Sequence, residues 1–223
     1  MSDNNYSVSN PTGIIDKIAL KKRVVMLQMF LNEFPDHSLS SILDVGVTAD
    51  RASLSSNYFE KYYPRKEKII ALSNQNAAFL ENVYPGIKFS LGDAKKLPYD
   101  DQSIDVVFSS AVIEHIGCQE NQKKMLSECF RVAKKGVFIT TPNRWYPIEV
   151  HTILPLLHWL PKTAHRKLLR AFGLKFYSSE ENLNLLDRKT LSNFCSEIGI
   201  SNYVIKPVTT MGFTSNLILI IKK

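Results

Sequence analysis

Short apolar runs alternate along the chain with segments in which apolar side chains recur at helical spacing. The apolar runs predict strands at 41–46, 68–73, 87–91, 104–109 and 137–141. The helical spacing predicts helices over 13–34, 75–84, 119–133 and 188–198. Strands that alternate with helices and are apolar throughout indicate a parallel sheet with helices on both faces.

Turn residues and caps mark the ends of these helices. Pro85 and Gly86 are predicted to end the second helix, and Gly136 to end the third before the fifth strand begins. Asp187 is predicted to cap the last helix through its side chain.

The C-terminal end has a different pattern. Two apolar runs, at 202–208 and 215–223, are separated by only a short connection. These strands must pair antiparallel, because a parallel crossover needs about a dozen residues. The sequence therefore predicts an α/β three-layer sandwich. Its Rossmann-like, doubly wound, seven-stranded sheet would be mostly parallel and end in an antiparallel hairpin.

Composition narrows the class of protein. The 223 residues are 44% hydrophobic and 22% charged, and we expect one domain over 1–223. The net charge of +7 indicates an anionic partner. We do not expect nucleic acid, because no RRM, KH or zinc-finger pattern is present. Cys118, Cys129 and Cys195 lack CxxC pairing, so we expect reduced thiols, a cytoplasmic protein and no metal site.

Four stretches occur in a specific order. They are ILDVGVTAD at 42–50, LGDAKKLPYDDQSIDVVFSSAVIEHIG at 91–117, KKGVFITTPN at 134–143 and the terminal hairpin. Together they resemble the class I S-adenosylmethionine-dependent methyltransferases, and the likeness covers about residues 41–223. It is greatest to methyltransferase-domain proteins of small-molecule and surface-glycan pathways. The resemblance implies S-adenosylmethionine as cofactor, an N-terminal helical extension over 1–38, and a cap over 144–186 that binds the acceptor.

The resemblance also implies a cofactor site at the ends of the strands. Asp44 would hold the ammonium group of the cofactor, or else cap nearby backbone amides. Gly46 would let the main chain approach the ligand, and Asp93 would accept a hydrogen bond from the adenine amino group. The expected cofactor-binding residues are Asp44, Gly46, Thr48, Ser73, Asn74, Gly92, Asp93, Ala94 and Ser109.

Two departures from the family pattern affect this site. Thr48 and Asp50 stand where glycines are usual, and a threonine at positive φ would be strained, so the loop must take another path. Ser73 and Asn74 stand where an acid usually holds the ribose hydroxyls.

The segment over 49–68 follows the altered loop and replaces a normally short helix. Its Asn57, Tyr58 and Tyr62 either complete the pocket or serve as helix-packing residues. Both interpretations fit the aromatic spacing.

The implied reaction is attack of an acceptor on the methyl carbon of a sulfonium, for which a protein mainly aligns the reactants. A hydroxyl acceptor also benefits from a general base. The candidate catalytic residues are Glu114 and His115, at the exit of the fourth strand, and His151 in the cap. His115 is either that base or a packing residue beside the cofactor. The candidate acceptor-binding residues are Arg144, Trp145 and Glu149.

Residues 151–177 mix aromatic and aliphatic side chains with lysine and arginine and contain no acid. Such a segment can lie on an anionic membrane surface, here the inner face of the membrane. Alternatively, its apolar side covers the sheet or forms a homodimer contact while its basic side faces water.

The leading interpretation is a methyltransferase that modifies the hydroxyl of a small-molecule, glycan or lipid-linked acceptor. The alternative is a methyltransferase-fold protein that binds no cofactor and acts as a partner or scaffold. Retention of Asp44, Gly46, Asp93 and the Glu114-His115 dipeptide favours the enzyme. The altered glycine loop and the lost acid at 73 favour the scaffold. The absence of GxGxxG disfavours an NAD-dependent enzyme.

Overall fold

A computed structural model describes residues 13–223 apart from 51, 52 and 54, so the first twelve residues of the predicted N-terminal extension lie outside it. The described chain forms one seven-stranded sheet in the order β3-β2-β1-β4-β5-β7-β6. The strands are β1 (Ile42–Val45), β2 (Ile69–Ser73), β3 (Lys88–Leu91), β4 (Ile104–Ser110), β5 (Ala133–Pro142), β6 (Tyr203–Thr210) and β7 (Phe213–Lys222). β7 pairs antiparallel with both of its neighbours, β5 and β6, and the other strand pairs of the sheet are parallel. The predicted fold class is confirmed.

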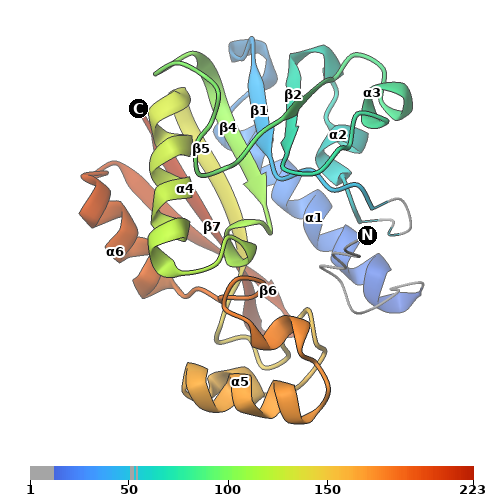
Figure 1. Ribbon diagram of the computed structural model, residues 1–223. Coiled ribbons are helices and arrows are strands. Elements are labelled where there is room, and N and C mark those ends of the chain that lie inside the picture. The colour runs from blue at the N-terminus through green and yellow to red at the C-terminus, as the bar shows by residue number, and fades with distance from the viewer. Residues whose placement is uncertain (1–12, 51–52, 54) are drawn as a thin grey trace.

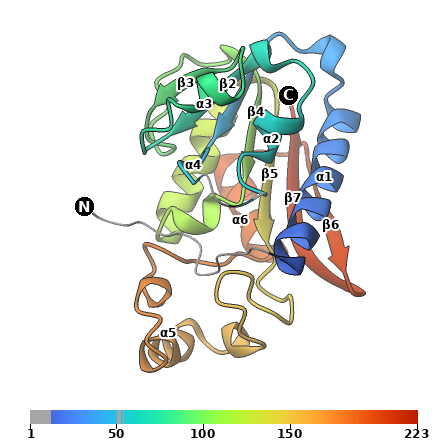
Figure 2. The same cartoon turned by 90° about the vertical axis from the view of Figure 1, so that its right-hand side faces the viewer.

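Helices cover both faces of this sheet (Figures 1 and 2). The helices on the two faces are α1 (Ile14–Glu33), α2 (Tyr58–Tyr62), α3 (Leu80–Val83), α4 (Gln119–Val132) and α6 (Arg188–Ile198), and α5 (Lys162–Ala171) lies beyond the strand ends. The buried side chains of α1, α2 and α3 belong to one core cluster, and those of α4 and α6 belong to another across the sheet. The result is the predicted three-layer sandwich. Asp187 caps α6 as predicted, because its Oδ1 accepts the Thr190 amide at 2.8 Å.

Aromatic packing fixes α1 and α2 on their face of the sheet. The ring of Phe30 from α1 lies 5.2 Å from Phe59 of α2, and 5.4 Å from both Phe108 and Phe138 of the sheet. Phe59 in turn stacks on Phe108 at 4.0 Å. Edge-to-face and offset contacts of this kind add about 0.5–1.5 kcal/mol per pair beyond the area buried. The altered segment after β1 is therefore anchored to the core at α2.

The helix predicted over 75–84 is much shorter in the structure, since α3 spans only Leu80–Val83. Side chains account for the difference. Ser73 Oγ accepts the Gln75 amide at 3.2 Å, and Asn76 Oδ1 accepts the Ala78 amide at 3.1 Å. These local bonds offer the backbone an alternative to helical hydrogen bonds and delay the start of the helix.

The prediction that Gly136 ends a helix is wrong. Gly136 lies inside β5, opposite Lys222 of β7. A β-carbon there would come within 2.3 Å of the Ile221 carbonyl oxygen and 2.8 Å of the Phe34 ring. The glycine is required by the close approach of α1 and β7 to this strand.

The segment 144–186, which the resemblance implies is an acceptor-binding cap, leaves the sheet after β5 and returns before α6. Figures 1 and 2 show it, with α5, beyond the carboxyl ends of β4 and β5. It has a small core of its own, formed by Leu169, Tyr177 and Leu183. Asn143 and Leu186 pair at its base, so both ends of the cap leave the sheet side by side. In the described part of the chain, no helix is long and apolar enough to cross a membrane.

We predict that Gly136→Ala lowers the free energy of unfolding by about 1–3 kcal/mol, because the added methyl group overpacks the junction of β5, β7 and α1. Lys134→Ala is the matched control, since Lys134 is exposed on the same strand. Denaturant unfolding measures both variants. Equal midpoints for the two would contradict this packing constraint.

Candidate functional site

The loop after β1 follows a path set by Gly46 and Asn57. Gly46 has a φ of 100°, and a β-carbon there would come within 2.2 Å of Cγ2 of Val112. The Thr48 amide donates to Asn57 Oδ1 at 3.0 Å, and Asn57 Nδ2 donates back to the Thr48 carbonyl at 2.9 Å. Asn57, at φ 49°, adopts the left-handed conformation that asparagine tolerates. Thr48 is not among the described residues with positive φ, so the loop takes another path, as the sequence predicts.

Two buried carboxyl groups lie behind this loop. Asp44 of β1 is 6% exposed and Glu60 of α2 is 1% exposed. Neither carboxylate oxygen of Glu60 has a hydrogen-bond partner among the described residues. Burial raises the pKa of Asp44 well above its usual value, and the charge of Glu60 adds to the rise. Burial likewise raises the pKa of Glu60. The pair is a desolvated position with two carboxyl groups, and it favours a proton or an incoming cation.

A polar layer connects α1, α2 and the end of β4. The guanidinium of Arg23 lies 5.5 Å from the centre of the Tyr58 ring and donates to the Ser55 carbonyl. The Tyr58 hydroxyl donates to Ser110 Oγ at 3.2 Å. The negative charges of Asp16 and Glu114 act on Arg23 and oppose the effect of its burial. The segment after β1 is thus tied to the exit of β4.

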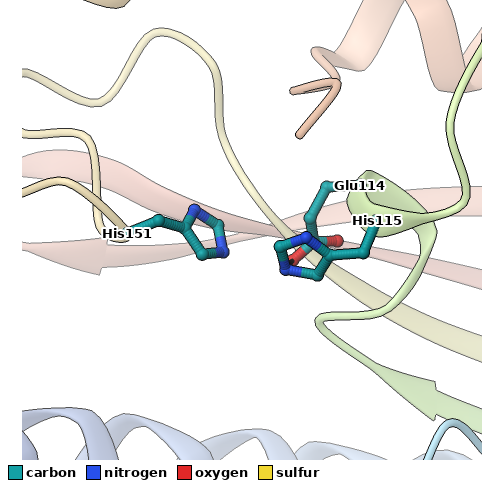
Figure 3. Close-up of side chains that lie close together, drawn as sticks. All are labelled: Glu114, His115 and His151. Atoms are coloured by element: carbon teal, nitrogen blue, oxygen red, sulfur yellow. Dashed lines mark ion pairs between the residues drawn. The ribbon is translucent and has the colours of Figure 1, made fainter. Parts of the chain in front are cut away.

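Two histidines from different parts of the chain meet beside Glu114. Figure 3 shows Glu114 and His115 at the exit of β4 and His151 on the cap, with their side chains turned toward one another. The two imidazole rings are 4.7 Å apart and nearly perpendicular. His115 Nε2 lies 4.0 Å from Glu114 Oε1. The three catalytic candidates predicted from the sequence therefore converge. We call them the Glu114–His115–His151 cluster.

Hydrogen bonds fix the orientation of both rings. His115 Nδ1 lies 2.6 Å from the Asn182 carbonyl oxygen, which can only accept, so Nδ1 carries a proton. His151 Nδ1 lies 2.6 Å from Oε1 of Glu149. Glu149 also accepts the Thr152 amide and hydroxyl at 2.7 and 2.6 Å. In both rings the Nε2 atom is therefore the lone-pair nitrogen whenever the imidazole is neutral.

The two histidines have opposite electrostatic surroundings. Burial lowers the pKa of His115 to about 3, and the charge of His151 contributes. Burial also acts to lower the pKa of His151, but the carboxylate of Glu149 outweighs it, so the pKa of His151 is raised. Glu149 has a pKa of about 2, because its bonds and charge interaction with His151 outweigh its own burial. A neutral imidazole thus lies beside a basic one.

Glu114 contributes a buried carboxyl group to the cluster. It is fully buried, and burial raises the pKa of its carboxyl group. Oε2 accepts the Thr141 hydroxyl at 2.9 Å, whereas Oε1 has no hydrogen-bond partner in the described chain.

Asn184 holds the turn that carries this glutamate. Its amide donates to the Glu114 carbonyl at 2.7 Å, and its side-chain Nδ2 donates to the Gly117 carbonyl at 2.8 Å. Gln122 of α4 donates to the carbonyls of Ile113 and Asn184 at 3.0 and 2.7 Å. The cap and α4 therefore clamp both ends of the 113–117 turn.

A family model described as a methyltransferase domain matches residues 43–140, which run from β1 into β5. This match, together with the strand order, supports a class I S-adenosylmethionine-dependent methyltransferase.

Individual relatives agree with this assignment. The chain is 40% identical over 81 residues to a "Probable S-adenosylmethionine-dependent methyltransferase" of Mycolicibacterium smegmatis, covering 34% of the chain and 30% of the relative. It is 30% identical over 112 residues to the phthiotriol/phenolphthiotriol dimycocerosates methyltransferase of Mycobacterium tuberculosis, covering 47% and 38%. The chain thus matches only 30% and 38% of the length of these relatives.

The fold is also similar to solved structures. One is magnesium protoporphyrin IX methyltransferase from Synechocystis PCC 6803 with bound S-adenosylhomocysteine. It aligns with a TM-score of 0.59 at 11% identity, covering 94% of this chain and 86% of that one. At this identity the likeness concerns the fold alone.

Several predicted cofactor residues lie at the ends of β2 and β3. The Gly92 amide donates to the Ser73 carbonyl at 2.9 Å, so the two strand ends meet. Asn74 and Asp93 are exposed, and Asp93 Oδ1 accepts the Lys95 amide at 2.9 Å. Ala94, next to Asp93, is buried.

Ser109 is placed differently from the other predicted cofactor residues. It is fully buried, and its hydroxyl donates to the Val45 carbonyl at 2.8 Å. This bond ties β4 to β1, so the hydroxyl is engaged within the sheet.

Tyr62 is 41% exposed, with the Lys61 ammonium 5.3 Å from the centre of its ring.

Glu149 and the other two acceptor candidates lie in different places. Glu149 is in the cluster, as the partner of His151. Trp145 instead lines a surface groove of about 580 Å³ beside α6, and its Nε1 donates to Asp187 Oδ2 at 3.1 Å. The Arg144 guanidinium lies 5.5 Å from the Trp145 ring and donates to the Leu160 carbonyl. No residue of the Glu114–His115–His151 cluster is among the residues that line this groove.

The sequence reasoning missed Glu60, Arg23, Thr141 and Asn184. Glu60 had a usable signal, since it is a lone acid between apolar and aromatic residues that were expected to pack. Arg23 lies on a helix whose pattern gives no sign of its long-range partners. Thr141 and Asn184 act through contacts with the distant 113–117 turn, which sequence spacing does not reveal.

We predict that the advantage of Glu60→Gln over wild type in unfolding free energy grows as pH rises from about 4 toward 7. The pKa of Glu60 is raised on folding, so its stabilising contribution is present below the usual pKa of about 4.3 and is lost as pH rises through the folded value. The glutamine cannot ionise, and the gain should reach about 1 kcal/mol or more, the scale of a buried unsatisfied polar group.

Chemical denaturation across this pH range measures the effect. Glu120→Gln is the control, because Glu120 is 79% exposed and pairs only at the surface with Lys123. A difference between Glu60→Gln and wild type that is flat with pH would contradict the assigned electrostatics.

Proposed function

We propose that the chain transfers the methyl group of S-adenosylmethionine to the hydroxyl of a small-molecule, glycan or lipid-linked acceptor. The observation that carries the proposal is the hydrogen-bonded Glu149–His151 pair, which faces His115 at the carboxyl ends of the strands. In open α/β sheets this edge is where ligands bind. A carboxylate-oriented histidine suits an acceptor that must lose a proton.

The buried acids after β1 fit the cofactor. Glu60 has two carboxylate oxygens without partners in the described chain, next to Asp44, and an ammonium group would satisfy them. Gly46, Asp93 and the Ala94 amide are the further residues that we propose for this ligand. When bound, it supplies an electrophilic methyl carbon on a good leaving group. The S-adenosylhomocysteine in the Synechocystis relative supports the same ligand class.

His151 has the role of general base in this proposal. Its Nδ1–H is fixed on Glu149, so Nε2 receives the proton of the acceptor hydroxyl, and the ionised Glu149 stabilises the imidazolium that forms. His115, held neutral by burial, lies next to it and positions the acceptor by packing contact. Arg144 and Trp145 would contact the part of a larger acceptor that extends from the cap.

The rival is a methyltransferase-fold scaffold that binds no cofactor. Calorimetric titration with S-adenosylmethionine and S-adenosylhomocysteine separates the two. We expect both ligands to bind and Asp93→Ala to weaken them about tenfold or more, through loss of a charged acceptor. Asp100→Ala, an exposed loop change, is the control. No binding of either ligand at millimolar concentration would refute the enzyme.

The proposed function also predicts how two histidine variants change turnover. His115→Ala and His151→Ala should bind the cofactor as wild type does but slow turnover by about 100-fold or more, the usual contribution of acid–base groups. Release of S-adenosylhomocysteine with a panel of small hydroxyl acceptors measures turnover, with the exposed His37→Ala as control. Unchanged turnover in both cluster variants would remove their assigned roles.

We also propose that the cap contacts an anionic membrane surface. Support comes from exposed apolar side chains on a basic segment. They are Ile153, Leu156, Trp159, Leu160 and Phe172. Such a combination binds through apolar insertion and charge attraction.

Co-sedimentation with anionic vesicles at low salt tests this contact. We expect binding that high salt weakens and that Trp159→Ala with Phe172→Ala reduces about tenfold, because both apolar anchors are lost. Val204→Ala is the control, since Val204 is exposed on β6, away from the cap. Absence of the wild-type protein from the vesicle pellet would end the proposal.

A further inference from the structure

The Glu114–His115–His151 cluster has the donors of a metal site. Each residue offers one ligand atom, and these atoms all lie within 4.8 Å of one another. One carboxylate and two imidazoles form a common donor set for zinc and for non-haem iron. The spacing of these residues does not predict the site, because the two histidines are separated in the chain by the whole of α4 and β5.

The second nitrogen of each ring is already held. His115 Nδ1–H is bonded to the Asn182 carbonyl, and His151 Nδ1–H to the Glu149 carboxylate. Histidines that bind metals almost always donate their other N–H to a carbonyl or a carboxylate, which fixes the tautomer and the ring orientation. In each of the two histidines, the tautomer with a proton on Nδ1 leaves a lone pair on Nε2. The two rings face each other on that side (Figure 3).

Glu114 supplies an independent observation. Its side chain is fully buried, one oxygen is bonded to Thr141, and the other oxygen, Oε1, has no hydrogen-bond partner in the described chain. Leaving a buried acceptor unsatisfied is costly, and more so when the group is charged. Coordination of a cation by Oε1 removes that cost. The positive charge of the Arg23 guanidinium, on α1, also acts on the Glu114 carboxylate and favours its ionised form.

We propose that Glu114 Oε1, His115 Nε2 and His151 Nε2 bind a divalent transition-metal ion such as Zn²⁺. Around tetrahedral zinc, neighbouring ligand atoms are about 3.4 Å apart. The 4.0 Å between His115 Nε2 and Glu114 Oε1 would therefore close by less than about 1 Å. The carboxylates of Glu114 and Glu149 together balance the two positive charges. A fourth position is left for an oxygen ligand.

This site goes beyond the proposed methyl transfer and does not depend on it. With the ion bound, His151 Nε2 is a ligand, and an acceptor hydroxyl at the fourth position loses its proton more readily because the metal polarises it. In the metal-free protein, the same nitrogen is the base. The two states therefore use one lone pair and exclude each other.

Titration of chelator-treated protein with Co²⁺ and Zn²⁺ tests the site. The exposed thiol of Cys118 is first removed as Cys118→Ser, because a free thiol also binds these ions. We expect one equivalent of Co²⁺ with ligand-field absorption in the visible range. Zn²⁺ should displace it, with micromolar or tighter affinity in competition with a chromophoric chelator.

Variants locate the ion. His151→Asn and Glu114→Gln should each weaken Zn²⁺ binding at least about tenfold, and Glu149→Gln about 10–100-fold through the orientation of His151. His37→Asn, at an exposed histidine, should bind as the parent does. Metal-free melting curves identify any variant that fails to fold. In that case Glu149→Gln, which keeps all three ligands, gives the decisive result.

Each outcome decides the proposal. Absence of a one-to-one Co²⁺ complex, or full affinity in His151→Asn, would overturn the metal site and leave the histidine base standing. Metal binding without binding of S-adenosylmethionine would support the site while refuting the proposed methyl transfer. The two failures are therefore distinguishable.

Discussion

The buried amide of Asn184 is the contact on which the site depends. It joins the end of the cap to the turn after β4, and Gln122 ties both to α4. Asn184 is 1% exposed and Gln122 is also 1% exposed, so these bonds form where water cannot replace them. A polar network buried in this way fixes a single arrangement, because partial satisfaction is expensive. Glu114 and His115 stand on the turn that this network holds.

Buried carboxyl groups occur both beside His151, at Glu149, and behind the loop after β1, and the pKa values at the two places shift in opposite directions. Glu149 is 2% exposed but keeps a low pKa, because His151 supplies a positive charge at 2.6 Å. At Asp44 and Glu60 burial outweighs the charge of Lys66, and the pKa values of both carboxyl groups are raised. In the Glu149–His151 pair the negative charge is balanced by a residue of the chain. The Asp44–Glu60 pair instead needs a proton or the cation of a ligand. This difference separates the residues suited to moving a proton from those suited to binding the cofactor.

The sequence predicted the sheet well because period and length carry that information locally. Continuous apolar runs located four parallel strands within about two residues and β5 with its start four residues late, and the short connection predicted the antiparallel hairpin. Two predictions failed where tertiary contacts outweighed local preference. Gly136 was interpreted as a breaker but is required by the close approach of Phe34 and Ile221. The helix before Pro85 was shortened by the Ser73 and Asn76 side chains.

The sequence pattern singled out the residues of the Glu114–His115–His151 cluster but not their arrangement. Glu114, His115 and His151 each stood out from their place after a strand or in the cap, yet nothing in their spacing placed the two rings 4.7 Å apart. That contact exists because the cap returns to the sheet at Leu186, beside Asn143, and brings Glu149 and His151 over the β4 exit. One half of the cluster therefore belongs to the sheet and the other to the cap. Any ligand that bridges Glu114 and His151 must stabilise the docked cap, because it gains both contacts only when the two halves meet.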